Sequence, residues 1–351
     1  MKNLHVLVIL FITCVFVQPA IANKQNSPTQ FEHSSAMASV RSVDIDRAVY
    51  EIGDISSLAD GEITLSRLND IETRSDWSLP AREAVIYQFT QSLAELPRDA
   101  VAVEVMQHLR DYQPRALVPH EDHEDALVPL FNIRAAAAGI ENGWQRKEYA
   151  AEALRLLETD PESLVAIYNK STNHNQRSAI LETLQYAKLA DVVIVQNAAL
   201  AQLDQAWVLT PLVGVTAVIT ADTFAVQQLL INGRGAGLSS ALVQVDKRLQ
   251  YSETADLLVF AIQQAPAVNA TLAISAWWPG LRHDAATRDL MVGLLTDPEL
   301  GASAALALAQ SPDMQTIKAL LDTAAIDSVA GQRARMALDV NRNRLLGERQ
   351  Q

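Results

Sequence analysis

Residues 146–168 read RKEYAAEALRLLETDPESLVAIY, two apolar helical stretches with a short polar break between them. After the break, Leu164, Ile167 and Tyr168 have the i, i+3, i+4 spacing of a buried helix face. Asp160 and Pro161 lie in the break, where an aspartate supplies a hydrogen-bond acceptor and a proline presets the first turn of a helix. The stretch therefore predicts two helices joined by a tight turn.

The same triplet spacing returns five times further along the chain. The triplets are Leu164-x-x-Ile167-Tyr168, Val195-x-x-Ala198-Ala199, Val226-x-x-Leu229-Leu230, Leu258-x-x-Ala261-Ile262, Met291-x-x-Leu294-Leu295 and Ile317-x-x-Leu320-Leu321. Steps between their fourth positions are about 31, 31, 32, 33 and 26 residues, which is typical of repeat proteins. An alanine-rich stretch precedes each triplet, and QRARMALDV, residues 332–340, closes the series.

One helix pair cannot bury its apolar face alone, whereas stacked pairs build a continuous core. The sequence therefore predicts an all-α fold, an α-solenoid of stacked antiparallel helix pairs. Small residues on the alanine-rich helices should let neighbouring helices approach closely.

Residues 145–340 resemble the HEAT-like repeats, including the short bacterial variety. The pattern of Arg, an alanine-rich helix, Asp-Pro and a second helix carries the resemblance, which implies a superhelix whose second helices line its concave side. Irregular links such as WWPGLRHDAAT, residues 277–287, depart from the family pattern. The Trp, Leu-Gly and Tyr signature of tetratricopeptide repeats is missing.

The start of the chain resembles a secretory signal peptide. Lys2 is followed by an apolar run from Leu4 to Val17, and Ala20-Ile21-Ala22 is a cleavage site that a signal peptidase accepts. An uncleaved anchor is the alternative. We expect this order: signal peptide 1–22, flexible polar leader 23–40, N-terminal helical region 41–140, HEAT-like repeats 141–346 and tail 347–351.

Cleavage after Ala22 would place the protein in the periplasm or outside the cell. The single cysteine, Cys14, precedes that site, so the mature chain would contain no thiol. A formal net charge of −13 disfavours binding to nucleic acid and to anionic lipid heads. No second apolar run is long enough to suggest membrane insertion after signal cleavage.

The stretch PHEDHED, residues 119–125, is the candidate metal site. His120 and His123 are three residues apart and would face one side of a helix, as two ligands of zinc or copper can. The alternative is a solvated helix start, because Pro119 suits a first turn and acidic residues complement the positive end of the helix dipole.

Two further features are candidates for binding a partner. Trp277 and Trp278 precede Pro279 and Gly280, so an exposed turn would offer them as anchors, or the rings fill space between repeats. Amides of the second helices could bind an extended peptide, or they are solvated surface. These amides belong to Gln196, Asn197, Gln202, Gln227, Gln228, Gln263 and Gln264.

The sequence contains no nucleophile elbow, phosphate-binding loop or dinucleotide-binding motif. We therefore expect a non-catalytic helical-repeat protein that binds another protein or peptide as a scaffold or adaptor, without a cofactor. Two alternatives stay open: a metal-binding protein or metal-dependent enzyme centred on His120 and His123, and a structural protein that maintains the cell envelope.

Overall fold

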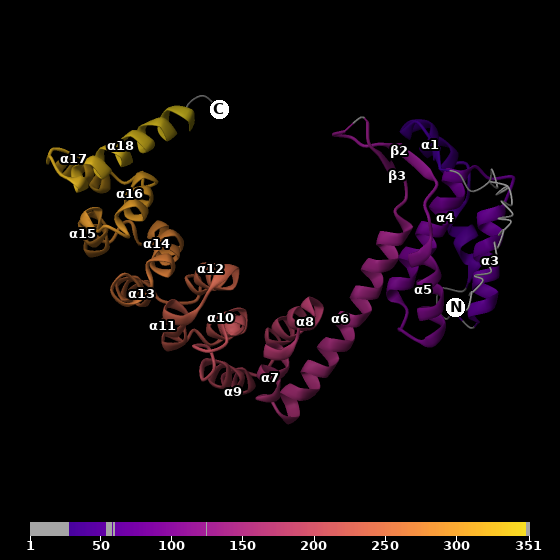
Figure 1. Cartoon of the computed structure of the whole chain (residues 1–351), viewed down its shortest axis with the longest axis horizontal. Coiled ribbons are helices and arrows are strands. Elements are labelled where there is room, and N and C mark those ends of the chain that lie inside the picture. Colours follow the sequence, from indigo (N-terminus) through magenta and orange to yellow (C-terminus); the bar gives the residue numbers. More distant parts are fainter. Residues whose placement is uncertain (1–27, 54–57, 59, 124, 349–351) are drawn as a thin grey trace, which may run out of the picture. The chain divides into compact units, whose positions relative to one another are not determined.

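The computed structural model describes residues 28–53, 58, 60–123 and 125–348 of the chain. The described part is all-α in class, with eighteen α-helices and three short strands (Figure 1). It divides into two compact units at Trp144 and Gln145, within the long helix α6 (Ile133–Thr159). The expected signal peptide, residues 1–22, lies outside the described residues.

The first unit is a cluster of helices around its own apolar core. Its helices are α1 (His33–Val40), α2 (Ile45–Ile52), α3 (Gly61–Thr73), α4 (Leu79–Ser92), the 3₁₀ turn η2 (Leu93–Glu95) and α5 (Ala100–Asp111). Ser78 caps α4 by accepting from the backbone N–H of Ala81, and Phe89 and Leu93 of the following face are buried.

Residues 33–40, expected within a flexible leader, form helix α1 instead. Ala36 and Val40 are buried, and α1 contacts α4. The helix therefore packs through a few apolar residues, although its composition is mostly polar. The strands β1 (Thr29–Gln30), β2 (Ala116–Pro119) and β3 (Leu127–Pro129) form a small sheet in the order β1-β2-β3. β1 pairs in parallel with β2, and β2 and β3 form an antiparallel hairpin.

The second unit alternates two kinds of helix, as the sequence predicts. One kind, the first row, consists of α8 (His174–Leu184), α10 (Thr210–Thr220), α12 (Gly235–Val245), α14 (Ala267–Leu281), α16 (Gly301–Ala309) and α18 (Val329–Glu348). The second-row helices are α7 (Ser163–Lys170), α9 (Leu189–Leu200), α11 (Thr223–Asn232), α13 (Tyr251–Gln264), α15 (Ala285–Gly293) and α17 (Met314–Ala324). The 3₁₀ turns η3 (Trp207–Leu209) and η4 (Leu294–Thr296) precede α10 and follow α15.

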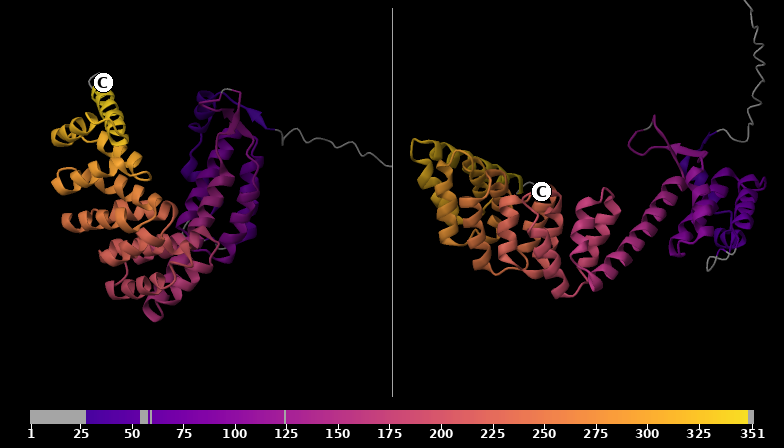
Figure 2. Two further views of the ribbon diagram at one scale, coloured as in Figure 1. Left: turned by 60° about the vertical axis from the view of Figure 1, so that its left-hand side comes forward. Right: turned by 60° about the horizontal axis from the view of Figure 1, so that its bottom comes forward.

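Contacts within each row join consecutive helices. From α8 to α18, every first-row helix contacts the next, and α7, α9, α11 and α13 do so in the second row. Within this unit the first row lies on the inner side of the bend drawn in Figures 1 and 2, and the second row on the outer side. This is opposite to what the family resemblance implies for the second helices.

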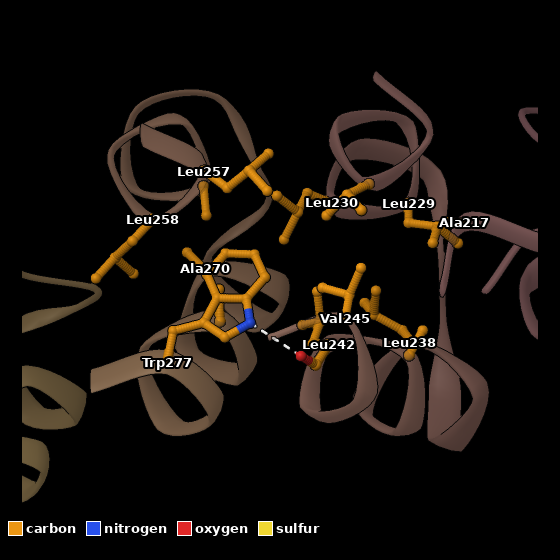
Figure 3. Close-up of a cluster of buried hydrophobic side chains, with 14 of the residues drawn as sticks. Ala217, Leu229, Leu230, Leu238, Leu242, Val245, Leu257, Leu258, Ala270 and Trp277 are labelled. Atoms are coloured by element: carbon orange, nitrogen blue, oxygen red, sulfur yellow. Dashed lines mark hydrogen bonds between the residues drawn. The ribbon is translucent and has the colours of Figure 1, made fainter. Parts of the chain in front are cut away.

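All six triplets lie on second-row helices or on the turn η4 that prolongs one of them. The leading residues of the first five triplets are buried, for example Val195 and Leu258, whereas Ile317 of the sixth is half-buried. Figure 3 shows how both rows supply the core, with Leu230 of α11 and Leu257 of α13 near Trp277 of α14. The last triplet differs, because Leu321 is 56% exposed where the series has no following second-row helix.

Small residues bring α10 and α12 together, as expected. A Cβ on Gly214 would lie 2.8 Å from the Cβ of Ala241, and one on Gly237 would lie 2.8 Å from Cγ of Pro211. Both distances are shorter than real Cβ contacts, so the two helices touch at the backbone level. A larger residue at either glycine would push α10 and α12 apart.

Candidate functional site: an uncharged row of helices

Four consecutive first-row helices carry no ionisable side chain. α10, α12, α14 and α16 contain no Asp, Glu, Lys, Arg or His, although 20% of the chain's residues are Asp, Glu, Lys or Arg. In the second row only α11 is equally free of charge. We call the side of this row on which its exposed residues lie the uncharged face; these residues belong to α12, α14 and α16, and α10 adds half-buried residues.

The uncharged face exposes apolar and hydroxyl side chains rather than a uniform solvated surface. Val243 of α12 is 49% exposed and Leu306 of α16 is 57% exposed. Ser240 and Ser275 are exposed at comparable positions of α12 and α14. Apolar side chains left open on a surface without charge are typical of a site that a partner covers.

Two grooves cross this face between neighbouring helices. The first lies between α10 and α12, where Val215 and Val218 face Ser240 and Gln244. The second lies between α14 and α16. The second groove is lined by Thr271, Ile274, Ser275, Trp278, Pro279, Ser303, Leu306, Ala307 and Gln310.

Two polar groups of residues lining the α14–α16 groove lack their usual partners: one is an indole N–H and the other is a backbone carbonyl. Nε1 of Trp278 is buried and has no hydrogen-bond acceptor among the described residues. Pro279 lies inside α14 and has no N–H, so the carbonyl of Ser275 lacks the donor that a helix normally supplies four residues later. A hydroxyl pair, Thr271 and Ser303, joins the two helices with an O–O distance of 3.0 Å.

Trp277 and Trp278 do not form the exposed turn that a partner anchor would need. α14 continues through Pro279 to Leu281, and Trp277 and Trp278 are 0% and 2% exposed. Nε1 of Trp277 donates to the carbonyl oxygen of Leu242 at 2.9 Å, which ties α14 to α12 (Figure 3). The exposed tryptophan of this unit is Trp207 of η3, at 60%, which we did not identify from the sequence.

The side-chain amides that the sequence suggests as a binding surface divide into buried residues and surface residues. Gln196 is buried: its Nε2 donates to Asp222 at 2.5 Å, and its Oε1 accepts from the hydroxyl of Thr220 at 2.8 Å. That glutamine joins α9 to the start of α11 and is not available to a partner. Asn197, Gln202, Gln263 and Gln264 are exposed, and Gln227 and Gln228 are half-buried, all outside the uncharged face.

Both interpretations of the PHEDHED stretch assumed a helix, but the structure has none there. The stretch connects β2 and β3, and the backbone N–H of His120 donates to the carbonyl of Ala126 at 2.8 Å. Residues 116–119 and 126–129 both read ALVP, and they pair as the two strands of the hairpin. The repeated ALVP is the sequence signal that could have predicted this hairpin.

His120 and His123 lie side by side in the hairpin loop, with ring centroids 5.3 Å apart. Nδ1 of His120 accepts from the backbone N–H of Asp122 at 3.1 Å, so the hydrogen of the neutral ring is on Nε2. No group of three or more His, Cys, Asp or Glu side chains that could hold a metal occurs in the described chain, which omits Glu124.

Glu83 of α4 is a buried carboxylate that the sequence did not reveal. One of its oxygens accepts from the backbone N–H of Arg115 at 2.6 Å and the other from that of Ala116 at 3.2 Å. Burial raises the pKa of the Glu83 carboxyl, and the two backbone hydrogen bonds oppose that rise. The side chain fixes the start of β2 against α4, so its role is structural.

A scan against protein-family models, a search of curated proteins and a search of solved structures each found no match to this chain. Over the residues that the structure describes, no helix combines the length and apolarity needed to cross a membrane.

Proposed function

We propose that this protein binds an uncharged segment of another protein or peptide on the uncharged face, as a scaffold or adaptor without chemistry of its own. The observation that carries the proposal is the absence of ionisable side chains from α10, α12, α14 and α16. A solvated helix surface is normally rich in charge, so a row without any is explained by a partner that covers it.

We further propose that the second unit is an α-solenoid related to the HEAT-like repeats. The alternation of the two helix kinds, the contacts within each row and the 31-residue steps of the triplets support this architecture. A stacked array would place the grooves of the uncharged face side by side, as binding of an extended segment requires.

We also propose that the protein is secreted into the periplasm or out of the cell. The apolar run and the small residues before residue 23 support this location. Sequencing the N-terminus of the protein recovered from cells tests it, with a start at Asn23 expected and a start at Met1 contradicting cleavage.

Binding of randomised peptide pools tests the main proposal. Three pools of capped 12-residue peptides would be compared. The first contains only neutral residues, the second has glutamate at four positions, and the third has lysine at four positions. We expect the protein to retain the neutral pool and to retain both charged pools less, because a buried unpaired charge is costly. Equal or stronger retention of a charged pool would contradict the proposal.

Two matched variants locate the binding. Leu306→Glu places a charge on the uncharged face, and Phe224→Glu places one on α11 at the same exposure, 57% and 58%. We expect Leu306→Glu to abolish retention of the neutral pool and Phe224→Glu to leave it unchanged. The reverse pattern would place the site on the second row.

A further inference from the structure

The α14–α16 groove is lined by two residues that each have a polar group without its usual partner. The donor is the Nε1–H of Trp278, a side chain that is 2% exposed. The acceptor is the carbonyl of Ser275, which loses its helical donor because residue 279 is a proline. Both residues line the same groove.

Leaving a buried N–H without a partner is costly, and most such groups in proteins are satisfied. Trp277 shows the usual solution one residue earlier, because its Nε1–H donates to the carbonyl of Leu242. An acceptor supplied by a ligand would satisfy Trp278 in the same way. The surrounding helices carry no charge, so the fitting acceptor is a neutral carbonyl rather than a carboxylate.

A peptide group offers one carbonyl acceptor and one N–H donor, which match this pair. We propose that the α14–α16 groove binds the backbone of an extended, uncharged peptide: a peptide carbonyl accepts from Nε1 of Trp278, and a peptide N–H donates to the carbonyl oxygen of Ser275. This inference rests on the proposed function and names the groups that recognise the ligand. An extended peptide fits better than a helix, whose backbone groups are already paired internally.

The first test follows the indole signals of the isotope-labelled mature protein by NMR while the neutral 12-residue pool is added. We expect the Trp278 indole proton to move downfield and exchange more slowly with water, because it gains an acceptor. The Trp277 indole proton, already bonded, should stay in place. If the Leu306 backbone amide moves and the Trp278 indole does not, the inference is wrong and the proposed function stands. If neither signal moves, both are wrong.

The second test uses three variants that separate binding from folding. Trp278→Phe removes the unpartnered N–H together with part of a buried ring, and we expect about three- to tenfold weaker binding of the neutral pool and a smaller loss of Tm than in Trp277→Phe. Trp277→Phe, the matched control, should lower the Tm and leave the affinity of the folded protein unchanged. Pro279→Ala returns a donor to Ser275, so it should raise the Tm and weaken binding. Unchanged affinity in both Trp278→Phe and Pro279→Ala would overturn the inference.

Discussion

Most buried polar side chains among the described residues have partners within the fold, whereas Nε of Arg82 and the indole nitrogens of Trp144 and Trp278 have none. Glu83, Gln196 and Trp277 each bond to another element of the fold. Trp278 has no such partner among the described residues and lies beside a groove. The sequence could not separate the two tryptophans, because adjacent residues on one helix face different neighbours and the neighbours are far away in the chain.

Glu83 should make the stability of the first unit depend on pH. Its pKa is raised by burial above the unfolded value of about 4.3, so its contribution to the free energy of unfolding is full below that value. The contribution is then lost as the pH rises through the folded pKa. Glu83→Gln removes this slope, and it costs about 1–3 kcal/mol because an amide has one acceptor oxygen for two backbone N–H donors.

Urea unfolding between pH 4 and pH 8 measures the effect of Glu83→Gln. Glu104→Gln, at an exposed position of α5, controls for the loss of one charge. An equal slope in the wild-type protein and in Glu83→Gln would show that this carboxyl does not titrate as proposed.

The last position of the triplet is a leucine in three repeats, and two of these leucines differ in exposure, so they can be compared as a test and its control. Leu230 is 0% exposed and Leu321 is 56% exposed. We expect Leu230→Ala to lower the free energy of unfolding by about 2–5 kcal/mol, because it leaves a cavity in the core. Leu321→Ala should change it by about 0.5 kcal/mol or less, and similar losses at both positions would contradict the burial difference.

Helix starts are local features of the sequence, and side chains cap several of them, although no side chain caps α7, where the sequence predicts Asp160 as the acceptor. Asp222 accepts from the N–H groups of Phe224 and Ala225, and Asp313 accepts from that of Thr316, at the breaks that the sequence marks. The hairpin of β2 and β3 was missed because an acidic stretch after a proline also suits a helix start. The strands are distinguished from a helix start only by the pairing of the two ALVP segments. That pairing is a contact between two segments, which the local sequence of either one does not show.

Polar side chains of first-row helices also join helices that are distant in sequence. Nδ2 of Asn269 in α14 donates to the carbonyls of Leu230 and Gly233 at the end of α11, at 2.9 and 3.0 Å. Arg333 of α18 does the same for Leu295 and Asp297 after α15. These contacts satisfy carbonyls that a helix end leaves without donors.

Asn269→Ala should therefore destabilise the second unit by about 1–3 kcal/mol, since two buried carbonyls lose their donor. The control is Asn232→Ala, a half-buried residue whose amide donates to the side chain of Gln228. Thermal unfolding followed by circular dichroism measures both, and equal Tm values for the two variants would argue against the role of Asn269.

The alternation of helices was predictable in the second unit, where the sequence repeats. The arrangement of the first unit was not predictable, because its sequence has no repeat. Steps of about 31 residues predicted the alternating helices of the second unit. No repeat marks the first unit, and the polar composition of residues 33–40 predicts a flexible leader where the structure has helix α1. The resemblance predicts a binding surface on the second-row helices, whereas the uncharged face, on which we propose binding, belongs to the first row.

Crosslinking in the cell that produces the protein tests the uncharged face most directly. A photoreactive phenylalanine would replace Leu306 on α16 in one strain and Phe224 on α11 in another, positions of equal exposure on the two rows. We expect irradiation to give one discrete adduct from position 306 and none from position 224. An adduct from position 224 alone, or none from either, would contradict binding on the uncharged face.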